Sequence, residues 1–268
     1  MFRPILQFLG ARLISWMRLL GGAWRLVCQT AYWGTAGRLR GVPLSGQSIA
    51  DQMVRVGIGA VPIVCLVNLI VGMILAVSMG GPMRDLGLIN TVPNIVAVAI
   101  TRQLAPMMTA IVMCGFVGAA MAAELGTMTV SEEVLALEVS GLNPVRFLVV
   151  PRMLAVVLAM PCLVVLANFM GMFGGYLVGT HMLGIGSAKY LAVNNAAASA
   201  VDIVRGAFFK GTIFGMLITS LACHEGLSVT GGAEGVGRAT TRAVVISMVA
   251  IILADLLINV FFYQTMGK

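Results

Sequence analysis

The stretch AELGTMTVSEEVLALEVSGLNPVRFLVVPR, residues 123–152, is the one long polar, acid-rich segment in an otherwise apolar chain. Thr129 stands three residues before Glu132, which is the spacing of a capping box, so a helix is expected to begin there. Gly141 can adopt the left-handed conformation that ends a helix, and Pro144 cannot continue one. The stretch therefore predicts a short helix, residues 129–141, between two long apolar segments.

This short helix would have an apolar stripe and an acidic first turn. Val130, Val134 and Leu137 would share one face, and the glutamates would lie where the helix dipole favours negative charge. Either the helix packs on the membrane-facing surface of its own protein, or it docks into a separate cytoplasmic subunit. We favour docking. The residues expected to couple the two proteins are Glu132, Glu133, Val134, Leu137 and Glu138.

The composition is that of an integral membrane protein. Hydrophobic residues make up 59% of the 268 residues and charged residues 10%, with a mean hydropathy of +1.00. The net charge of +7 does not indicate a nucleic-acid partner, because seven of the 17 basic residues precede the first long apolar run and so favour anionic lipid headgroups. The five cysteines have no CxxC spacing, which indicates small core residues rather than a disulfide or metal framework.

The first 50 residues are expected to lie outside the hydrocarbon core. From Phe2 to Leu20 apolar residues recur at helical spacing, and Arg3, Arg18 and Arg25 fall mostly on the opposite side. This pattern predicts an amphipathic helix lying in the membrane interface over residues 1–30. Residues 35–51 are rich in Gly and Ser and predict a bend. The chain thus divides into an interfacial helix with its bend, 1–50, and a transmembrane domain, 51–268.

Five apolar segments approach the length that crosses a hydrocarbon core of about 30 Å. They are expected at about 57–79, 93–122, 147–180, 206–223 and 240–263. With the N-terminus in the cytoplasm, eleven basic residues fall on the cytoplasmic side and six on the other, so the C-terminus is predicted outside. The predicted fold is an all-α membrane protein with an N-terminal interfacial helix, five transmembrane helices and a short cytoplasmic coupling helix at about 129–141.

Polar residues within the expected spans are the candidate cavity residues, since an ionisable group at such depth faces the bundle interior or a wet cavity. They are Arg102, Gln103, Asp255 and Asn259. Counted along their helices, Arg102 and Asp255 reach similar depths, so we expect the two to pair. The alternative is that Arg102 alone faces the cavity and meets a lipid phosphate, while a neighbouring helix satisfies Asp255.

No pattern in the chain predicts catalysis. None of the three lysines, Lys189, Lys210 and Lys268, stands in a Walker A setting, so energy from ATP would have to come from a partner subunit. The glycine-rich run 231–237 follows no strand and is expected to be a flexible loop that caps the last helix. His181 and His224 lack companions at metal-ligand spacing. The sequence therefore predicts no enzyme activity, no metal site and no cofactor.

Two blocks of sequence carry a family resemblance. TRQLAPMMTAIVMCGFVGAAMAAELGTMTVSEEVLALEVSGLNPVRFLVVPRMLA, residues 101–155, and GGAEGVGRATTRAVV, residues 231–245, resemble the MlaE/YrbE permease family, the membrane subunits of ABC transporters that work with MCE proteins. The resemblance extends over about 50–265. It implies a homodimer in the bacterial inner membrane, bound to cytoplasmic ATPases, periplasmic MCE lipid-binding subunits and a small cytoplasmic STAS-type subunit. It also implies movement of phospholipids between the inner and outer membranes, which maintains outer-membrane lipid asymmetry, with residues 129–141 as the coupling helix.

The chain departs from the family pattern at two positions. Gln103 stands where the family usually has a glutamate that lines the lipid cavity, and Phe116 where it commonly has an arginine. Two rival functions remain open. An ion-coupled secondary transporter of a lipid or amphipathic substrate would use Arg102 and Asp255 as a relay. An intramembrane lipid enzyme would need a nucleophile and a base, which the sequence does not offer.

Overall fold

A computed structural model describes residues 21–33, 46–197 and 200–266, and in these ranges the chain is helical with connecting turns. Five of its helices are long and apolar enough to cross a membrane, which confirms the all-α membrane fold and the number of spans. They are Ile49–Asp85, Ile89–Val130, Val145–His181, Val201–Leu227 and Gly232–Gln264. Each is longer at both ends than the sequence predicted. Residues 21–33 form a helix, whereas the rest of the expected interfacial helix and most of the bend lie outside the described residues.

The first two spans are continuous helices interrupted by π-helical turns. The first consists of α2 (Gly46–Met53), η1 (Val54–Ile58) and α3 (Gly59–Asp85). The second consists of η2 (Ile89–Thr91), α4 (Val92–Ala99), η3 (Ile100–Leu104), α5 (Ala105–Met113), η4 (Cys114–Gly118) and α6 (Ala119–Val130). Wide π-helical turns are frequent at functional sites, and the second span contains two of them, η3 and η4.

A short helix, α7 (Glu133–Val139), joins the second span to the third. The third span consists of η5 (Val145–Val149) and α8 (Val150–His181), and α9 (Ser187–Ala197) follows it. The fourth span consists of α10 (Ala200–Val204), η6 (Arg205–Lys210) and α11 (Gly211–Leu227), and the last is α12 (Gly232–Met266). The glycine-rich run is an ordered turn at Gly231 followed by the first turns of α12, not a flexible loop.

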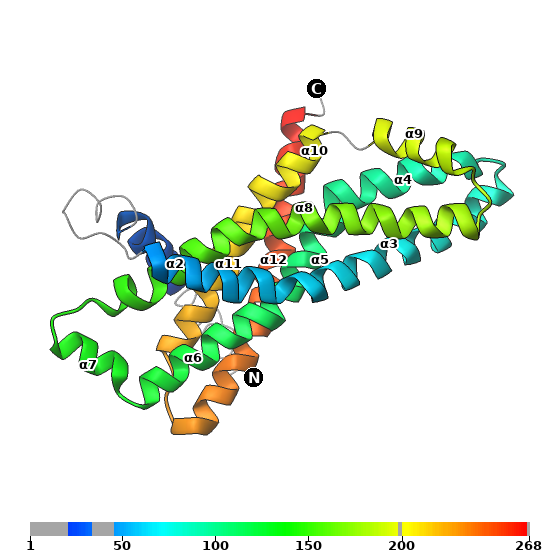
Figure 1. The fold of residues 1–268 in the computed structure, drawn as a ribbon. Coiled ribbons are helices and arrows are strands. Elements are labelled where there is room, and N and C mark those ends of the chain that lie inside the picture. The colour runs from blue at the N-terminus through cyan, green and yellow to red at the C-terminus, as the bar shows by residue number, and fades with distance from the viewer. Residues whose placement is uncertain (1–20, 34–45, 198–199, 267–268) are drawn as a thin grey trace, which may run out of the picture.

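Helices α3 and α8 lie side by side along much of their length (Figure 1). Glycines make this approach possible: a Cβ atom added at Gly72 would collide with the carbonyl oxygen of Gly171, and one added at Gly174 would collide with that of Leu69. Such close backbone contact supplies the van der Waals packing that holds helices together in lipid. The glycines of the third span thus pack against the first span within one chain.

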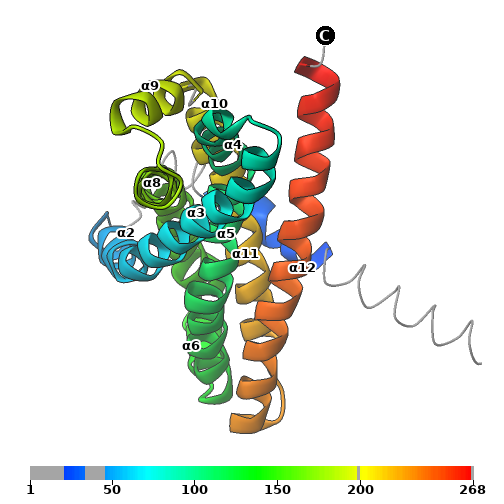
Figure 2. The same ribbon diagram turned by 90° about the vertical axis from the view of Figure 1, so that its right-hand side faces the viewer.

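Helices α6, α11 and α12 form a second group that crosses the first (Figures 1 and 2). Figure 2 shows the C-terminal half of α12 standing apart on one side of the molecule. Large apolar side chains on this half are exposed, among them Leu253 at 55%, Leu256 at 59% and Leu257 at 69%. In a membrane this face contacts lipid tails or another protein.

Residues 123–152 fold differently from the capping-box prediction. α6 continues through Val130, and the hydroxyl of Thr129 donates to the Leu125 carbonyl at 2.8 Å instead of capping a new helix. α7 begins only at Glu133, after Glu132 adopts a left-handed φ of 62°, so the helix has 7 residues and not about three turns. The prediction failed because it did not extend the apolar second span into the polar segment.

The end of α7 agrees with the sequence. Gly141 has a φ of +74°, and its N–H donates to the Glu138 carbonyl at 3.0 Å while Leu142 N–H donates to Leu137 at 2.9 Å. This is the Schellman arrangement, which satisfies the last carbonyls of a helix. Asn143 then caps the start of the third span through its side-chain oxygen, 3.0 Å from the N–H of Val145.

Candidate functional site

A cluster of polar side chains lies inside the bundle where the second, fourth and fifth spans meet. Gln103 comes from η3, Lys210 from η6, and Asp255 and Asn259 lie one turn apart on α12. Both η3 and η6 are π-helical, and a π-helical turn rotates the following residues relative to a regular α-helix. These two turns help to direct Gln103 and Lys210 toward the same face of α12.

Lys210 is the centre of the cluster. Its Nζ lies 2.9 Å from Asp255 Oδ1, 3.0 Å from Gln103 Oε1, 2.9 Å from Asn259 Oδ1 and 2.9 Å from the backbone oxygen of Arg102. The other carboxylate oxygen of Asp255 accepts hydrogen bonds from the amides of Gln103 and Asn259. Asn259 also donates to Gln103 Oε1 at 2.8 Å, which closes the network.

The cluster is buried and electrically balanced. The side chains of Lys210 and Asp255 are 4% and 5% exposed, so the ammonium and the carboxylate neutralise each other out of water. On insertion scales each charge alone would cost about 3 kcal/mol at the centre of a membrane helix. Because Gln103 is an amide, no second carboxylate upsets this balance. The amide at position 103 therefore leaves one positive and one negative charge in the cluster.

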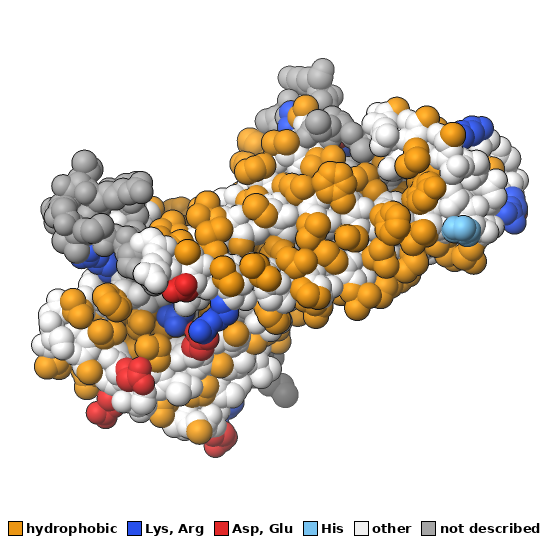
Figure 3. Space-filling view, in the orientation of Figure 1, with side chains coloured by type: hydrophobic (Ala, Val, Ile, Leu, Met, Phe, Trp, Pro, Cys, Tyr) orange, Lys and Arg blue, Asp and Glu red, His pale blue; other side chains and the backbone are white. Residues whose placement is uncertain are grey.

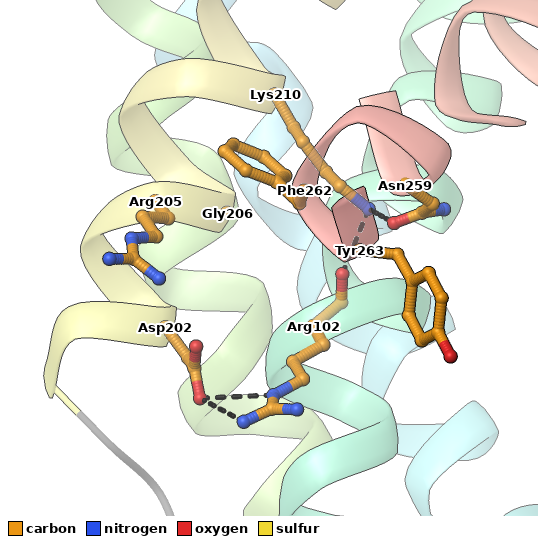
Figure 4. Close-up of a pocket in the computed structure, with 8 residues that line it drawn as sticks. All are labelled: Arg102, Asp202, Arg205, Gly206, Lys210, Asn259, Phe262 and Tyr263. Carbon is orange, nitrogen blue, oxygen red and sulfur yellow. Dashed lines mark hydrogen bonds and ion pairs between the residues drawn. The ribbon is translucent and has the colours of Figure 1, made fainter. Parts of the chain in front are cut away.

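A cavity of about 430 Å³ opens beside this cluster, between the second, fourth and fifth spans (Figure 4). Its lining residues are Arg102, Asp202, Arg205, Gly206, Lys210, Asn259, Phe262 and Tyr263. The Arg102 side chain is 62% exposed, whereas the Lys210 side chain in the wall is almost fully buried. The cavity thus combines an accessible guanidinium with aromatic rings, a combination suited to an anionic group that carries an apolar tail.

The predicted pairing of Arg102 with Asp255 is wrong. Arg102 donates from Nε and Nη2 to one oxygen of Asp202, each at 3.0 Å (Figure 4). Asp255 pairs instead with Lys210. One part of the alternative agrees with the structure: a neighbouring helix supplies the partner of Asp255, which is Lys210 of the fourth span. Arg102 lines the cavity together with Asp202, Arg205 and Lys210. Arg102 and Asp255 both contact Lys210, so they lie at similar heights in the bundle, but the depth count said nothing about which residue of the fourth span lies between them.

Sequence reasoning missed six of the eight residues that line the cavity. They are Asp202, Arg205, Gly206, Lys210, Phe262 and Tyr263. Lys210 lies inside the span expected at about 206–223, but so close to its end that it was counted with the basic residues outside the membrane. The helix in fact begins near Val201, nine residues before Lys210, which places this lysine well inside the span, where an ionisable residue is a candidate by default.

Two polar residues of the spans lie away from the cavity. Asn68 donates to the Val64 carbonyl of its own helix at 2.9 Å, and Asn168 is buried with no hydrogen-bond partner in the described part of the chain.

Phe116 is 42% exposed on η4, and its ring lies beside Gly59 of the first span. The described residues contain no group of three His, Cys, Asp or Glu side chains that could hold a metal ion.

The predicted coupling residues divide between the two faces of α7. Val134 and Leu137 pack against the protein's own apolar cluster, which includes Leu125 and Met153. This matches the interpretation in which the helix lies against its own protein. On the outer face, Glu132, Glu133 and Glu138 are exposed. The same face exposes Leu135 at 54% and Val139 at 81%.

Fold and site together define a class: a multi-pass helical membrane protein with a cavity between its spans, as in transport subunits. The chain belongs to the MlaE permease family, because the family model described as Permease MlaE matches residues 49–261. This confirms the resemblance seen in residues 101–155 and 231–245.

Relatives cover most of the chain. A probable ABC transporter permease protein of Rickettsia prowazekii is 35% identical over 222 residues, which are 83% of this chain and 85% of the relative. The intermembrane phospholipid transport system permease protein MlaE of Haemophilus influenzae is 30% identical over 259 residues, 95% of this chain and 96% of the relative. The chloroplastic protein trigalactosyldiacylglycerol 1 of Arabidopsis thaliana is 37% identical over 217 residues, 81% of this chain and 62% of the relative.

Proposed function

We propose that this protein is the permease subunit of an ABC transporter that moves phospholipids between the inner and outer membranes of a bacterium and so maintains outer-membrane lipid asymmetry. Family membership and the names of the relatives in Rickettsia and Haemophilus support the class. The observation in this chain that carries the proposal is the exposed guanidinium of Arg102 in a cavity lined by Phe262 and Tyr263.

In this proposal Arg102 binds the phosphate of the lipid headgroup. A guanidinium forms strong paired hydrogen bonds with phosphate oxygens, and it would exchange the Asp202 carboxylate for the phosphate when a lipid enters. Lys210 would stay paired with Asp255 and hold the second, fourth and fifth spans together around the cavity. The aromatic rings of Phe262 and Tyr263 would contact the glycerol and upper acyl region.

The outer face of α7 is the proposed contact for a cytoplasmic ATPase. Leu135 and Val139 supply apolar area, and the surrounding glutamates supply charge. Movement of α7 would pass directly into the second span, because only Ser131 and Glu132 separate α7 from α6. The same span carries Arg102 and Gln103 on η3, so ATP-driven motion at one end reaches the cavity through one interrupted helix.

The proposed assembly is a homodimer in the inner membrane with its N-terminus in the cytoplasm and its C-terminus in the periplasm. The exposed apolar half of α12 is a surface on which a second copy or a partner's membrane helix can pack. Cytoplasmic ATPases, a periplasmic MCE-domain protein and a small STAS-type subunit complete the proposed complex. The orientation rests on the excess of basic residues toward the α7 end.

The rival function is ion-coupled secondary transport with Asp255 as the ion or proton carrier. The geometry of Asp255 argues against this rival function. Both of its carboxylate oxygens already accept hydrogen bonds from Lys210, Gln103 or Asn259. Reconstitution of the purified complex in liposomes with a fluorescent phospholipid separates the two. Lipid transfer should require ATP and should not respond to an imposed proton or sodium gradient; transfer by the permease alone along such a gradient would overturn the proposal.

A further inference from the structure

A second polar cavity lies at the α7 end of the bundle. It shares no lining residue with the cavity beside Lys210. Its volume is about 520 Å³, within the range of roughly 300–1,000 Å³ typical of ligand sites. Three spans form it, and its lining residues are Arg55, Ala123, Glu124, Thr127, Met128 and Arg152. Figure 3 shows basic and acidic side chains grouped at this end of the α3–α8 face, with many apolar side chains along its middle.

The charges in this cavity do not cancel. Glu124 lies between two arginines, 3.2 Å from Arg55 and 3.1 Å from Arg152. The Arg152 side chain is 9% exposed and also donates to the Leu148 carbonyl, yet its Nε has no partner among the described residues. Asp51, one turn before Arg55, makes no ion pair with any described residue. Among the lining residues, one carboxylate against two guanidiniums leaves a net positive charge, and the Arg55 side chain is 70% exposed.

The three charged residues lie at one depth, that of lipid headgroups. Arg55 is six residues from the end of its span at Ile49, Glu124 is six from Val130, and Arg152 is seven from Val145. At 1.5 Å per residue each is about 9–10 Å inside its helix end. Spans of 37–42 residues measure about 55–63 Å, whereas a bilayer with its headgroups is about 40–45 Å thick. The cluster therefore falls in the headgroup layer and not in the hydrocarbon.

An apolar track leads from this cluster along the first span toward the middle of the membrane. On the first span, Ile58, Leu66 and Ile70 follow Arg55 and are 66%, 57% and 41% exposed. We propose that the cavity binds the phosphate of a phospholipid from the leaflet on the α7 side, with its acyl chains along this track. This site goes beyond the transport cavity at Arg102, because it serves the opposite leaflet.

Photo-crosslinking tests the site. The full-length protein, carrying benzoylphenylalanine in place of the exposed Thr127, is placed in vesicles of phosphatidylethanolamine and phosphatidylglycerol with a trace of radiolabelled phosphatidylethanolamine. Labelled lipid should crosslink at this position, and Arg55→Gln should reduce the yield about tenfold, since a hydrogen bond to a charged group is lost. Arg238→Gln is the matched control, because this arginine is 64% exposed near the same end and pairs with Glu234 of its own helix.

Several results would overturn the proposal: no lipid crosslink at position 127, a yield unchanged by Arg55→Gln, or an equal loss in Arg238→Gln. Competition by millimolar inorganic phosphate would assign the site to a soluble anion instead of a lipid. The crosslink needs neither ATP nor a partner subunit, so its result stands even if ATP-driven transfer fails. Conversely, Arg102→Gln should abolish transfer while leaving the crosslink at position 127 unchanged.

Discussion

The buried pair of Lys210 and Asp255 permits a direct test of how the bundle is held together. Lys210→Met keeps a long unbranched side chain but removes the ammonium, so four acceptors within 3.0 Å lose their common donor. The Asp255 side chain is 5% exposed, and water cannot replace the lost partner. Removing one member of a buried ion pair costs about 3–5 kcal/mol, so the variant should be strongly destabilised.

A second substitution should recover most of this loss. Asp255→Asn removes the uncompensated charge from the Lys210→Met protein, while the new amide can still accept a hydrogen bond from Gln103 or Asn259. The double variant should therefore be more stable than Lys210→Met alone, with a coupling energy of about 0.5–3 kcal/mol between the two substitutions, the usual range for residues in one network. A merely additive result would mean that the pair does not act as a unit.

Thermal unfolding of the purified protein, in one detergent or nanodisc composition throughout, measures these differences. A loss of 3–5 kcal/mol corresponds to a fall in Tm of about 10 °C for a chain of this size. Lys189→Met is the control, since Lys189 is exposed on α9 and its replacement should leave the Tm unchanged. If Lys210→Met unfolds at the same temperature as Lys189→Met, the reasoning from burial and ion pairing is refuted.

Three further changes test the remaining features. Asp202→Asn should raise phospholipid affinity about tenfold, because the carboxylate no longer competes with a lipid phosphate for Arg102; unchanged binding of labelled lipid would contradict this. Leu135→Asp should reduce co-purification of the ATPase several-fold without lowering the Tm, and normal stoichiometry would exclude the outer face of α7. Gly72→Ala should lower the Tm, because its methyl group collides with the α8 backbone and costs about 1–3 kcal/mol. Gly81→Ala on the same helix meets nothing within 4 Å, so an equal fall there would refute the packing argument.

The candidate site was only partly predictable from the sequence. An ionisable or amide residue in an apolar run is conspicuous, which is why Arg102, Gln103, Asp255 and Asn259 were identified. The partner of each was not, because pairing depends on how helices rotate against one another. The π-helical turns η3 and η6 change that rotation, and no periodicity argument based on 3.6 residues per turn includes them.

The same limit applied to α7. The sequence predicted the acidic residues of α7 and its end at Gly141, because glycine adopts the left-handed conformation at a helix end without strain. The sequence did not predict where α7 begins, because the hydroxyl of Thr129 donates its hydrogen bond within α6. It also did not predict which face of α7 is buried, because that depends on the apolar cluster around Leu125.

The sequence by itself determined the class of fold and the number of spans. Both follow from a local rule: a membrane-crossing helix needs about 20 apolar residues. Only the tertiary structure decided that Lys210 neutralises Asp255, that Arg102 faces a cavity, and that Glu124 joins Arg55 to Arg152. Each of these features involves residues from different spans. The partner of a buried charge therefore depends on which opposite charge the helix packing brings close to it.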